Sequence, residues 1–240
     1  KVMKLDMVHP ITLDAAVQER LLGLADEVAT GCKAAVIADF GNGLLTAGLI
    51  TRLCQTLRKR VELLAGDVSG RRSALLHMRD MDLLTPTESE LRDALRDFDE
   101  SVNTVVWRLL ESTRSRRAFV TMGPEGLITF ERRPGAERDP AWSGRLRSEH
   151  VPAMAPYALD ALGCGDALLA AATLTLAAAG SNDADAFPIA AFLASIAAAT
   201  EAGRLGNEVI SAHDLRQGVR RLGDARLAVT TARPGARMVV

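Results

Sequence analysis

Short apolar segments alternate with longer segments of helical periodicity in the first half of the chain, and this alternation constrains the fold most. Helical patterns over 13–30 and 46–59 each precede an apolar, β-rich segment. The β-rich segments are 34–40, 61–68, 81–85 and 117–122. Such alternation is typical of a parallel sheet covered by helices on both faces. We therefore predict an α/β fold with a doubly wound, mostly parallel sheet flanked by helices.

The second half of the chain is mostly helical. Segment 126–131 follows 117–122 through a Gly-Pro-Glu-Gly turn, which predicts a hairpin, and the polar segment 132–145 reads as a surface loop. Two alanine-rich helices between 163 and 203 are apolar on every face, so we expect them to be buried all round. Gly180 is the expected stop of the first, and a last helix is expected from about Ser211.

Composition excludes several classes of function. Hydrophobic residues make up 48% of the chain and charged residues 25%, which is typical of a folded protein rather than a disordered one. The net charge of −1 provides no field for nucleic acid or an anionic membrane. We interpret Arg114, Arg116 and Arg117 as solvated surface, and the apolar run 167–179 is too short to span a bilayer. Neither a nucleic-acid nor a membrane partner is expected.

Cysteines and histidines form no recognisable metal or disulfide pattern. The cysteines are Cys32, Cys54 and Cys164, and the histidines are His9, His77, His150 and His213. Their irregular spacing, with no CxxC and no HExxH, favours reduced thiols in a cytoplasmic protein and structural histidines.

The stretch DALGCGDALLAAA (160–172) is the strongest candidate for chemistry. If Gly163, Cys164 and Gly165 form the turn into a helix, their N–H groups and the helix dipole make an anion site. A P-loop would need a following lysine, and the dinucleotide fingerprint would need glycine in place of Leu168.

An aspartate at the mouth of an anion hole suits phosphoryl transfer. The N–H groups would hold the charge of the migrating phosphoryl group while Asp166 accepts the proton of the attacking hydroxyl. The alternative is structural, because an aspartate in a first helical turn is favoured by the dipole and glycines allow tight packing. The residues alone leave both interpretations open.

The same stretch resembles the Asp-x-x-Gly-Ala-Gly-Asp signature of the ribokinase-like (phosphofructokinase-B) sugar kinases. Four further segments resemble that family in its own order, three of them its heptose-phosphate kinase branch. They are ADFGNGLLT (38–46), LLTPTESEL (83–91), VTMGPEG (120–126) and AGRLGNEVIS (202–211). The similarity runs from about residue 34 to 215.

The resemblance implies an ATP- and Mg²⁺-dependent kinase that phosphorylates a sugar or sugar phosphate, with heptose 7-phosphate as the first expectation and ADP-heptose biosynthesis as the setting. Dimerisation through lid strands is usual in that family, which makes a homodimer one expectation. The implied site residues are Asp166 as catalytic base, Gly163, Cys164 and Gly165 as anion hole, Thr121, Gly123 and Gly126 beside the nucleotide, Glu90 organising magnesium through water, and Asp39 with Asn42 near the phosphate end.

Each implied role has a structural alternative. Glu90 stands three residues after Thr87, which is the spacing of a capping box. Gly123 and Gly126 can serve only the hairpin turn, and Asp39 can simply end a strand. Cys164 is interpreted as a small residue in a tight turn rather than a nucleophile, because no base accompanies it.

Three departures bear on substrate and activity. Asn42 stands where the heptose-phosphate kinase segment has lysine, while Thr87 and Ser195 stand where the family carries asparagine. A kinase of another sugar, nucleoside or vitamin alcohol, or a nucleotide-binding homologue without activity, therefore remain alternatives. Segment 1–225 is expected to be the nucleotide-binding and catalytic portion without the family's N-terminal lid portion. Segment 226–240 is expected to be a linker or tail, leading to another domain in some relatives.

Overall fold

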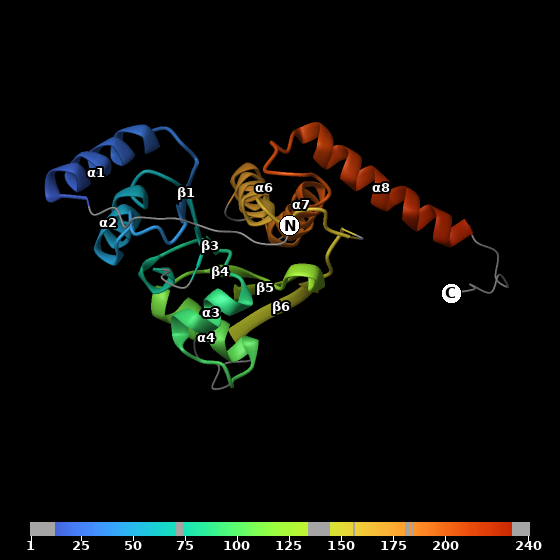
Figure 1. Ribbon diagram of the computed structural model, residues 1–240, viewed down its shortest axis with the longest axis horizontal. Coiled ribbons are helices and arrows are strands. Elements are labelled where there is room, and N and C mark those ends of the chain that lie inside the picture. Colours follow the sequence, from blue (N-terminus) through green and yellow to red (C-terminus); the bar gives the residue numbers. More distant parts are fainter. Residues whose placement is uncertain are drawn as a thin grey trace.

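The computed structural model describes residues 13–70, 74–133, 145–155, 157–180, 183 and 185–231. Its elements follow the predicted alternation of strands and helices (Figure 1). In chain order they are α1 (Ala15–Ala29), β1 (Ala34–Asp39), α2 (Ala47–Leu57), β2 (Leu63–Val68), the short 3₁₀ helix η1 (Leu75–His77), β3 (Leu83–Leu84), α3 (Glu88–Leu95), α4 (Val102–Thr113), β4 (Arg117–Thr121), η2 (Gly123–Glu125), β5 (Leu127–Arg132), β6 (Leu146–Val151), α6 (Cys164–Ala179), α7 (Ala186–Ala202) and α8 (Ala212–Thr231).

Local sequence signals set several helix ends. Asp14 caps α1 by accepting the Val17 N–H at 2.8 Å, and Thr46 caps α2 through the Leu49 N–H. These side chains satisfy N–H groups that lack a partner inside the helix. Gly180 ends α6 with φ of 85°, a left-handed backbone value that favours glycine, as the sequence predicted.

The described sheet has the strand order β1-β2-β3-β4-β5-β6. The pairs from β1 to β4 are parallel, while β4–β5 and β5–β6 are antiparallel, so the sheet is mostly parallel as predicted. Because β1 to β4 run parallel, their carboxyl ends share one edge of the sheet. Crevices for ligands in α/β folds lie at that edge.

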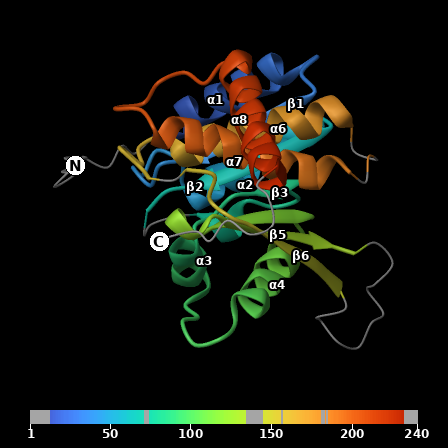
Figure 2. The same cartoon turned by 90° about the vertical axis from the view of Figure 1, so that its right-hand side faces the viewer.

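Alternate residues of the strands supply two separate cores. One face carries Leu64, Leu84 and Val120 and packs against α1, α2 and α4. The other carries Leu63, Leu83 and Phe119 and packs against α6 and α7. Figures 1 and 2 show α3 and α4 on one side of the sheet and α6 and α7 on the other. The period-two alternation along each strand thus places apolar side chains in both layers.

The expectation that the two alanine-rich helices are buried on every face is wrong. Leu174 of α6 is 70% exposed and Ile189 of α7 is 49% exposed. The helices pack against each other and the sheet on one side only, with α8 packed on α7 (Figure 1). No described helix is both long and apolar enough to cross a membrane.

The predicted polar loop 132–145 falls between the end of β5 at Arg132 and the start of β6 at Leu146, and most of it lies outside the described residues. One further expectation needs correction. Arg117 is not solvated surface: its side chain is 5% exposed, binds Glu131 at 2.7 Å and lies over the Phe187 ring. Helix α8 continues past 225 to Thr231. The segments 1–12, 134–144 and 232–240 lie outside the described residues.

Candidate active site

The amino end of α6 forms the glycine turn that the sequence predicted. Gly163 is the residue before the helix and has φ of 82°. A Cβ on Gly163 would lie 2.4 Å from Asn207 Oδ1 and 3.0 Å from Glu201 Oε1, so only glycine fits there without rearrangement. Sequence reasoning missed the role of Glu201, in the last turn of α7, and of Asn207, in the loop after α7; both pack against the turn. Nothing lies within 4 Å of a Cβ placed on Gly165.

The N–H groups of this turn are only partly used by the protein. The Cys164 N–H donates to Ala161 O at 3.4 Å, which is a long bond. Within the described residues, the Gly163, Gly165 and Asp166 N–H groups have no recorded acceptor. Two donors of the predicted 163–165 set are therefore available to an anion, and the Asp166 N–H is a third.

Asp166 is exposed on the first turn of α6. Its carboxylate has no recorded hydrogen bond within the described part of the chain, so it does not serve as a cap. Its negative charge acts on Asp67, which places these two carboxylates in the same neighbourhood. An exposed carboxylate next to unused N–H groups can accept a proton from a bound hydroxyl.

Asp67 is a residue that the sequence analysis missed. It lies near the carboxyl end of β2, is 9% exposed and accepts a hydrogen bond from Thr85 Oγ1 at 2.7 Å. The pKa of Asp67 is raised to about 7: burial is the largest cause, the nearby Glu90 and Asp166 carboxylates add to it, and the hydrogen bond from the Thr85 hydroxyl opposes it. Its position before the end of a buried strand was the available signal.

Glu90 makes the capping box that its spacing allowed. Its Oε2 accepts the Thr87 N–H at 2.9 Å, and Thr87 Oγ1 accepts the Glu90 N–H at 3.2 Å. Its Oε1 also accepts the Gly70 N–H at 3.1 Å. The structural interpretation is therefore confirmed. Both oxygens keep lone pairs that can accept further hydrogen bonds from water.

A pocket of about 520 Å³ joins the glycine turn to the β4–β5 hairpin. Of the predicted site residues, Thr121, Gly123, Gly126, Cys164 and Gly165 line it. The other described lining residues are Thr87, Pro124, Leu127, Ala153, Met154, Ala155, Tyr157, Ala158, Ala161, Leu168, Ser195, Ala198, Ala199 and Ala202. Its volume suits a small organic ligand. The structure thus brings the hairpin and the helix terminus together around one cavity.

Gly126 also has a structural role at this pocket. Its φ is 93°, and a Cβ would lie 2.2 Å from Val151 O, so β6 could not approach a larger residue. Gly123 has φ of 58° and nothing within 4 Å. The hairpin interpretation is therefore sound for both glycines, and the same turn forms a wall of the pocket.

Asp39 and Asn42 lie apart from this pocket. Asp39 ends β1, is 5% exposed and accepts the Gly41 N–H at 3.0 Å. Asn42 is exposed in the loop that follows. Strands β2 and β3 separate them from β4, so they border the carboxyl edge of the sheet at its far side.

The thiol beside the turn is poorly suited to nucleophilic attack. Burial raises the pKa of Cys164, and the Glu201 and Asp160 charges raise it further. A thiol of this kind stays protonated at neutral pH. All three cysteines are free, as expected.

The described residues contain no group of three or more His, Cys, Asp or Glu side chains arranged to hold a metal ion directly. The electrostatic coupling of Asp67 to Glu90 and Asp166 nevertheless marks a concentration of negative charge. Carboxylates that are coupled but spread apart fit a hydrated Mg²⁺, which keeps several waters and takes its other ligands from phosphate.

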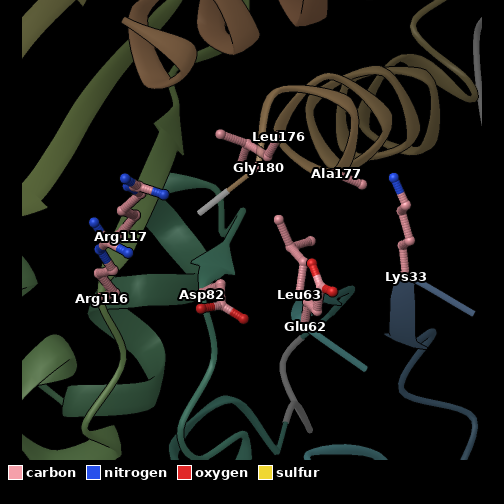
Figure 3. Close-up of a pocket in the computed structure, with 9 residues that line it drawn as sticks. All are labelled: Lys33, Glu62, Leu63, Asp82, Arg116, Arg117, Leu176, Ala177 and Gly180. Atoms are coloured by element: carbon pink, nitrogen blue, oxygen red, sulfur yellow. The ribbon is translucent and has the colours of Figure 1, made fainter. Parts of the chain in front are cut away.

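A second pocket lies at the opposite edge of the sheet, where the parallel strands begin (Figure 3). It holds only about 20 Å³ and is lined by charged side chains such as Lys33, Asp82 and Arg117. Asp82 binds Arg58 at 2.5 Å and Arg117 binds Glu131. Its size and these ion pairs make it unsuitable for a nucleotide.

Comparison with known proteins identifies relatives for this arrangement. Residues 45–209, more than half of the chain, match the family described as pfkB family carbohydrate kinase. A curated relative named bifunctional protein HldE from Pseudomonas fluorescens is 27% identical over 96% of this chain and 44% of its own length. HldE of Pseudomonas aeruginosa is 29% identical over 92% of this chain and 42% of its own length. The chain spans less than half the length of these relatives.

Solved structures share the fold. Phosphofructokinase-2 from Escherichia coli in complex with potassium superposes with a TM-score of 0.70 at 19% identity, covering 90% of this chain and 65% of that chain. Ribokinase from Giardia lamblia superposes with a TM-score of 0.64 at 14% identity, covering 85% of this chain and 64% of that chain. These likenesses show a ribokinase-like fold.

Proposed function

Because this chain belongs to the pfkB family of carbohydrate kinases, we propose that it transfers the terminal phosphoryl group of ATP to a hydroxyl of a sugar or sugar phosphate. One observation supports this most strongly. Gly165 lines the pocket of about 520 Å³, its N–H has no recorded acceptor within the described residues, and the next residue, Asp166, carries an exposed carboxylate.

In the proposed mechanism the pocket binds the nucleotide with its phosphates toward the glycine turn. The Gly165 and Asp166 N–H groups stabilise the charge that spreads over the phosphoryl oxygens in the transition state. Asp166 accepts the proton of the attacking hydroxyl and orients its oxygen in line. Asp67 and Glu90 would hold Mg²⁺ through water, and when bound the ion neutralises charge on the phosphates.

A heptose 7-phosphate is the first substrate to test. The resemblance of segment 38–46 to the heptose-phosphate kinase branch and the relatives named HldE support it. Asn42 favours a second candidate, a kinase of another sugar, nucleoside or vitamin alcohol, because lysine is missing there. ADP release measured over a panel of alcohols separates them: turnover of heptose phosphates alone excludes the second. The free thiols are in keeping with a cytoplasmic enzyme.

The substitution Asp166→Asn in the full-length protein tests the role of the base. We expect kcat to fall by about 10²–10⁴-fold, since general base catalysis is lost. The Kd for ATP, measured by titration calorimetry, should stay within a few-fold of wild type. The matched control is Asp93→Asn on α3, which is exposed and outside the site.

Two outcomes contradict the proposal. Undiminished turnover by Asp166→Asn would reject Asp166 as the base. ATP binding by wild type with no phosphoryl transfer to any alcohol in the panel would identify a nucleotide-binding homologue instead.

A further inference from the structure

We propose that the nucleotide site selects its donor by the shape of a purine rather than by hydrogen bonds to the polar edge of the base, so that GTP and ITP replace ATP with a loss of kcat/KM below about 100-fold. This inference rests on the proposed function, because it assumes that the pocket binds a nucleoside triphosphate. It goes beyond that function by predicting how the pocket discriminates between purine triphosphates.

The composition of the pocket wall supports this inference. None of its described lining residues carries a carboxylate, amide, guanidinium, ammonium or imidazole group. The polar side chains among them are Thr87, Thr121, Tyr157, Cys164 and Ser195. Discrimination between adenine and guanine requires donors and acceptors matched to positions 6, 1 and 2 of the ring, which such a wall is poorly equipped to supply.

The polar lining residues come from different elements. Thr87 and Thr121 are bridged to each other where β4 ends, and Cys164 belongs to the glycine turn. In the proposed arrangement these three residues lie near the phosphates. Tyr157 is 69% exposed and therefore belongs to the rim. Ser195 is the remaining polar side chain available to contact a base.

Helix α7 offers the base a smooth apolar surface. Ser195, Ala198, Ala199 and Ala202 are spaced three, four and seven residues apart, so they share one face of the helix. Backbone groups on this face are also occupied: Ala199 O accepts the Gly203 N–H, and Ala202 O accepts the Leu159 and Asp160 N–H groups. The wall can therefore pack against the flat face of the base, but it offers few groups that could form hydrogen bonds with the polar atoms at the edge of the base.

Ser195 is the position where the resemblance to sugar kinases expects asparagine. Its hydroxyl has no recorded hydrogen bond within the described residues, and its residue is 6% exposed. A serine hydroxyl can rotate and act as donor or acceptor, so it accommodates either the 6-amino group of adenine or the 6-oxo group of guanine. An asparagine amide would present a longer and less adaptable pair of groups.

An apolar pocket rejects a near-isosteric ligand by at most about 100-fold, whereas a site built to pair with polar groups rejects the wrong ligand by about 10⁴-fold or more. The expected ratio of kcat/KM for ATP to that for GTP or ITP is therefore below about 100. A ratio above about 100 for both alternative donors would overturn the inference.

The test uses the full-length protein with saturating acceptor and Mg²⁺, and initial rates with ATP, GTP and ITP. In parallel, each nucleotide displaces a fluorescent ATP analogue, which gives Kd ratios without any need for turnover. The variant Ser195→Asn is expected to raise the ATP:GTP ratio by about tenfold in both assays. The matched control is Ser112→Asn, exposed on α4 across the sheet. An unchanged ratio in Ser195→Asn would reject the position of this residue beside the base, whereas the wild-type ratio decides the inference itself.

The binding assay keeps this proposal separate from the kinase proposal. Displacement ratios below about 100 without any turnover would support the shape-reading site and reject the kinase. Turnover with ATP and ratios above about 100 would support the kinase and reject the shape-reading site. The absence of nucleotide binding would reject both.

Discussion

At the scale of single residues, Gly163 links backbone geometry to the proposed chemistry. Its positive φ forms the turn into α6, whose Gly165 lines the pocket, and its missing side chain leaves room for Asn207. Two independent constraints therefore act at one position: a left-handed backbone and a close contact. A substitution that meets only one of them separates the two effects.

The pair Gly163→Ala and Gly180→Ala makes that separation. Both positions have φ above 80°, but a Cβ on Gly180 meets nothing within 4 Å. Gly180→Ala should lower the free energy of unfolding by about 1–2 kcal/mol through backbone strain alone. Gly163→Ala should lower it further and also reduce kcat/KM. Urea unfolding and steady-state kinetics measure both; equal losses of stability would argue against the Asn207 contact.

Asp67 makes stability depend on pH. Its pKa is about 7 in the folded protein against 3.8 for an ordinary aspartate. The stabilisation from the protonated form is therefore complete below about pH 4, declines as pH rises and is gone above about pH 7. We expect Asp67→Asn to gain stability relative to wild type between pH 5 and pH 8, by up to a few kcal/mol.

Urea unfolding of wild type and Asp67→Asn at pH 5, 6, 7 and 8 tests this expectation. A stability difference that does not change with pH would contradict the buried position of the carboxylate. Asp93→Asn, exposed on α3, is the control that should leave the pH profile unchanged.

At the scale of elements, most of the fold followed from apolar patterning, and the failures have physical causes. Strand β6 was missed because its sequence LRSEHV has apolar residues only at its ends, and the four residues between them are exposed. Its stability comes from pairing with β5 along one edge, which no local pattern records. The exposed faces of α6 and α7 could not be recognised from the sequence, because alanine occurs on both buried and exposed faces of helices.

The candidate site shows the same division between local and long-range information. Gly163 and Asp166 were predicted because a glycine turn before an acidic first helical turn is a local pattern. Asp67, Glu201 and Asn207 were missed because their proximity to that turn depends on how distant segments pack. Arg117 was placed on the surface because its partners Glu131 and Phe187 are remote in sequence.

At the scale of the whole molecule, the sheet separates two different environments. Its carboxyl edge holds the large pocket and the coupled acids, while its amino edge holds a small charged pocket bordered by Arg117 (Figure 3). Arg117 stands at the first position of β4, and Thr121, at the last, lines the large pocket. The ion pair with Glu131 joins β4 to β5, and the Phe187 contact joins both to α7. We infer that Arg117 stabilises the layers without taking part in the site.

Replacement of Arg117 by alanine should therefore lower stability and spare activity. Removal of one partner from a buried ion pair costs about 3–5 kcal/mol, since the remaining charge loses its compensation. The matched control is Arg147→Ala, whose pair with Glu149 is about half exposed and should cost less than about 1 kcal/mol. Urea unfolding measures both losses, and kcat/KM at a temperature where each variant is folded should match wild type. A fall in kcat/KM for the folded Arg117→Ala protein would contradict this inference. It would mean that a change at the first residue of β4 alters the pocket at Thr121, the last residue of the strand.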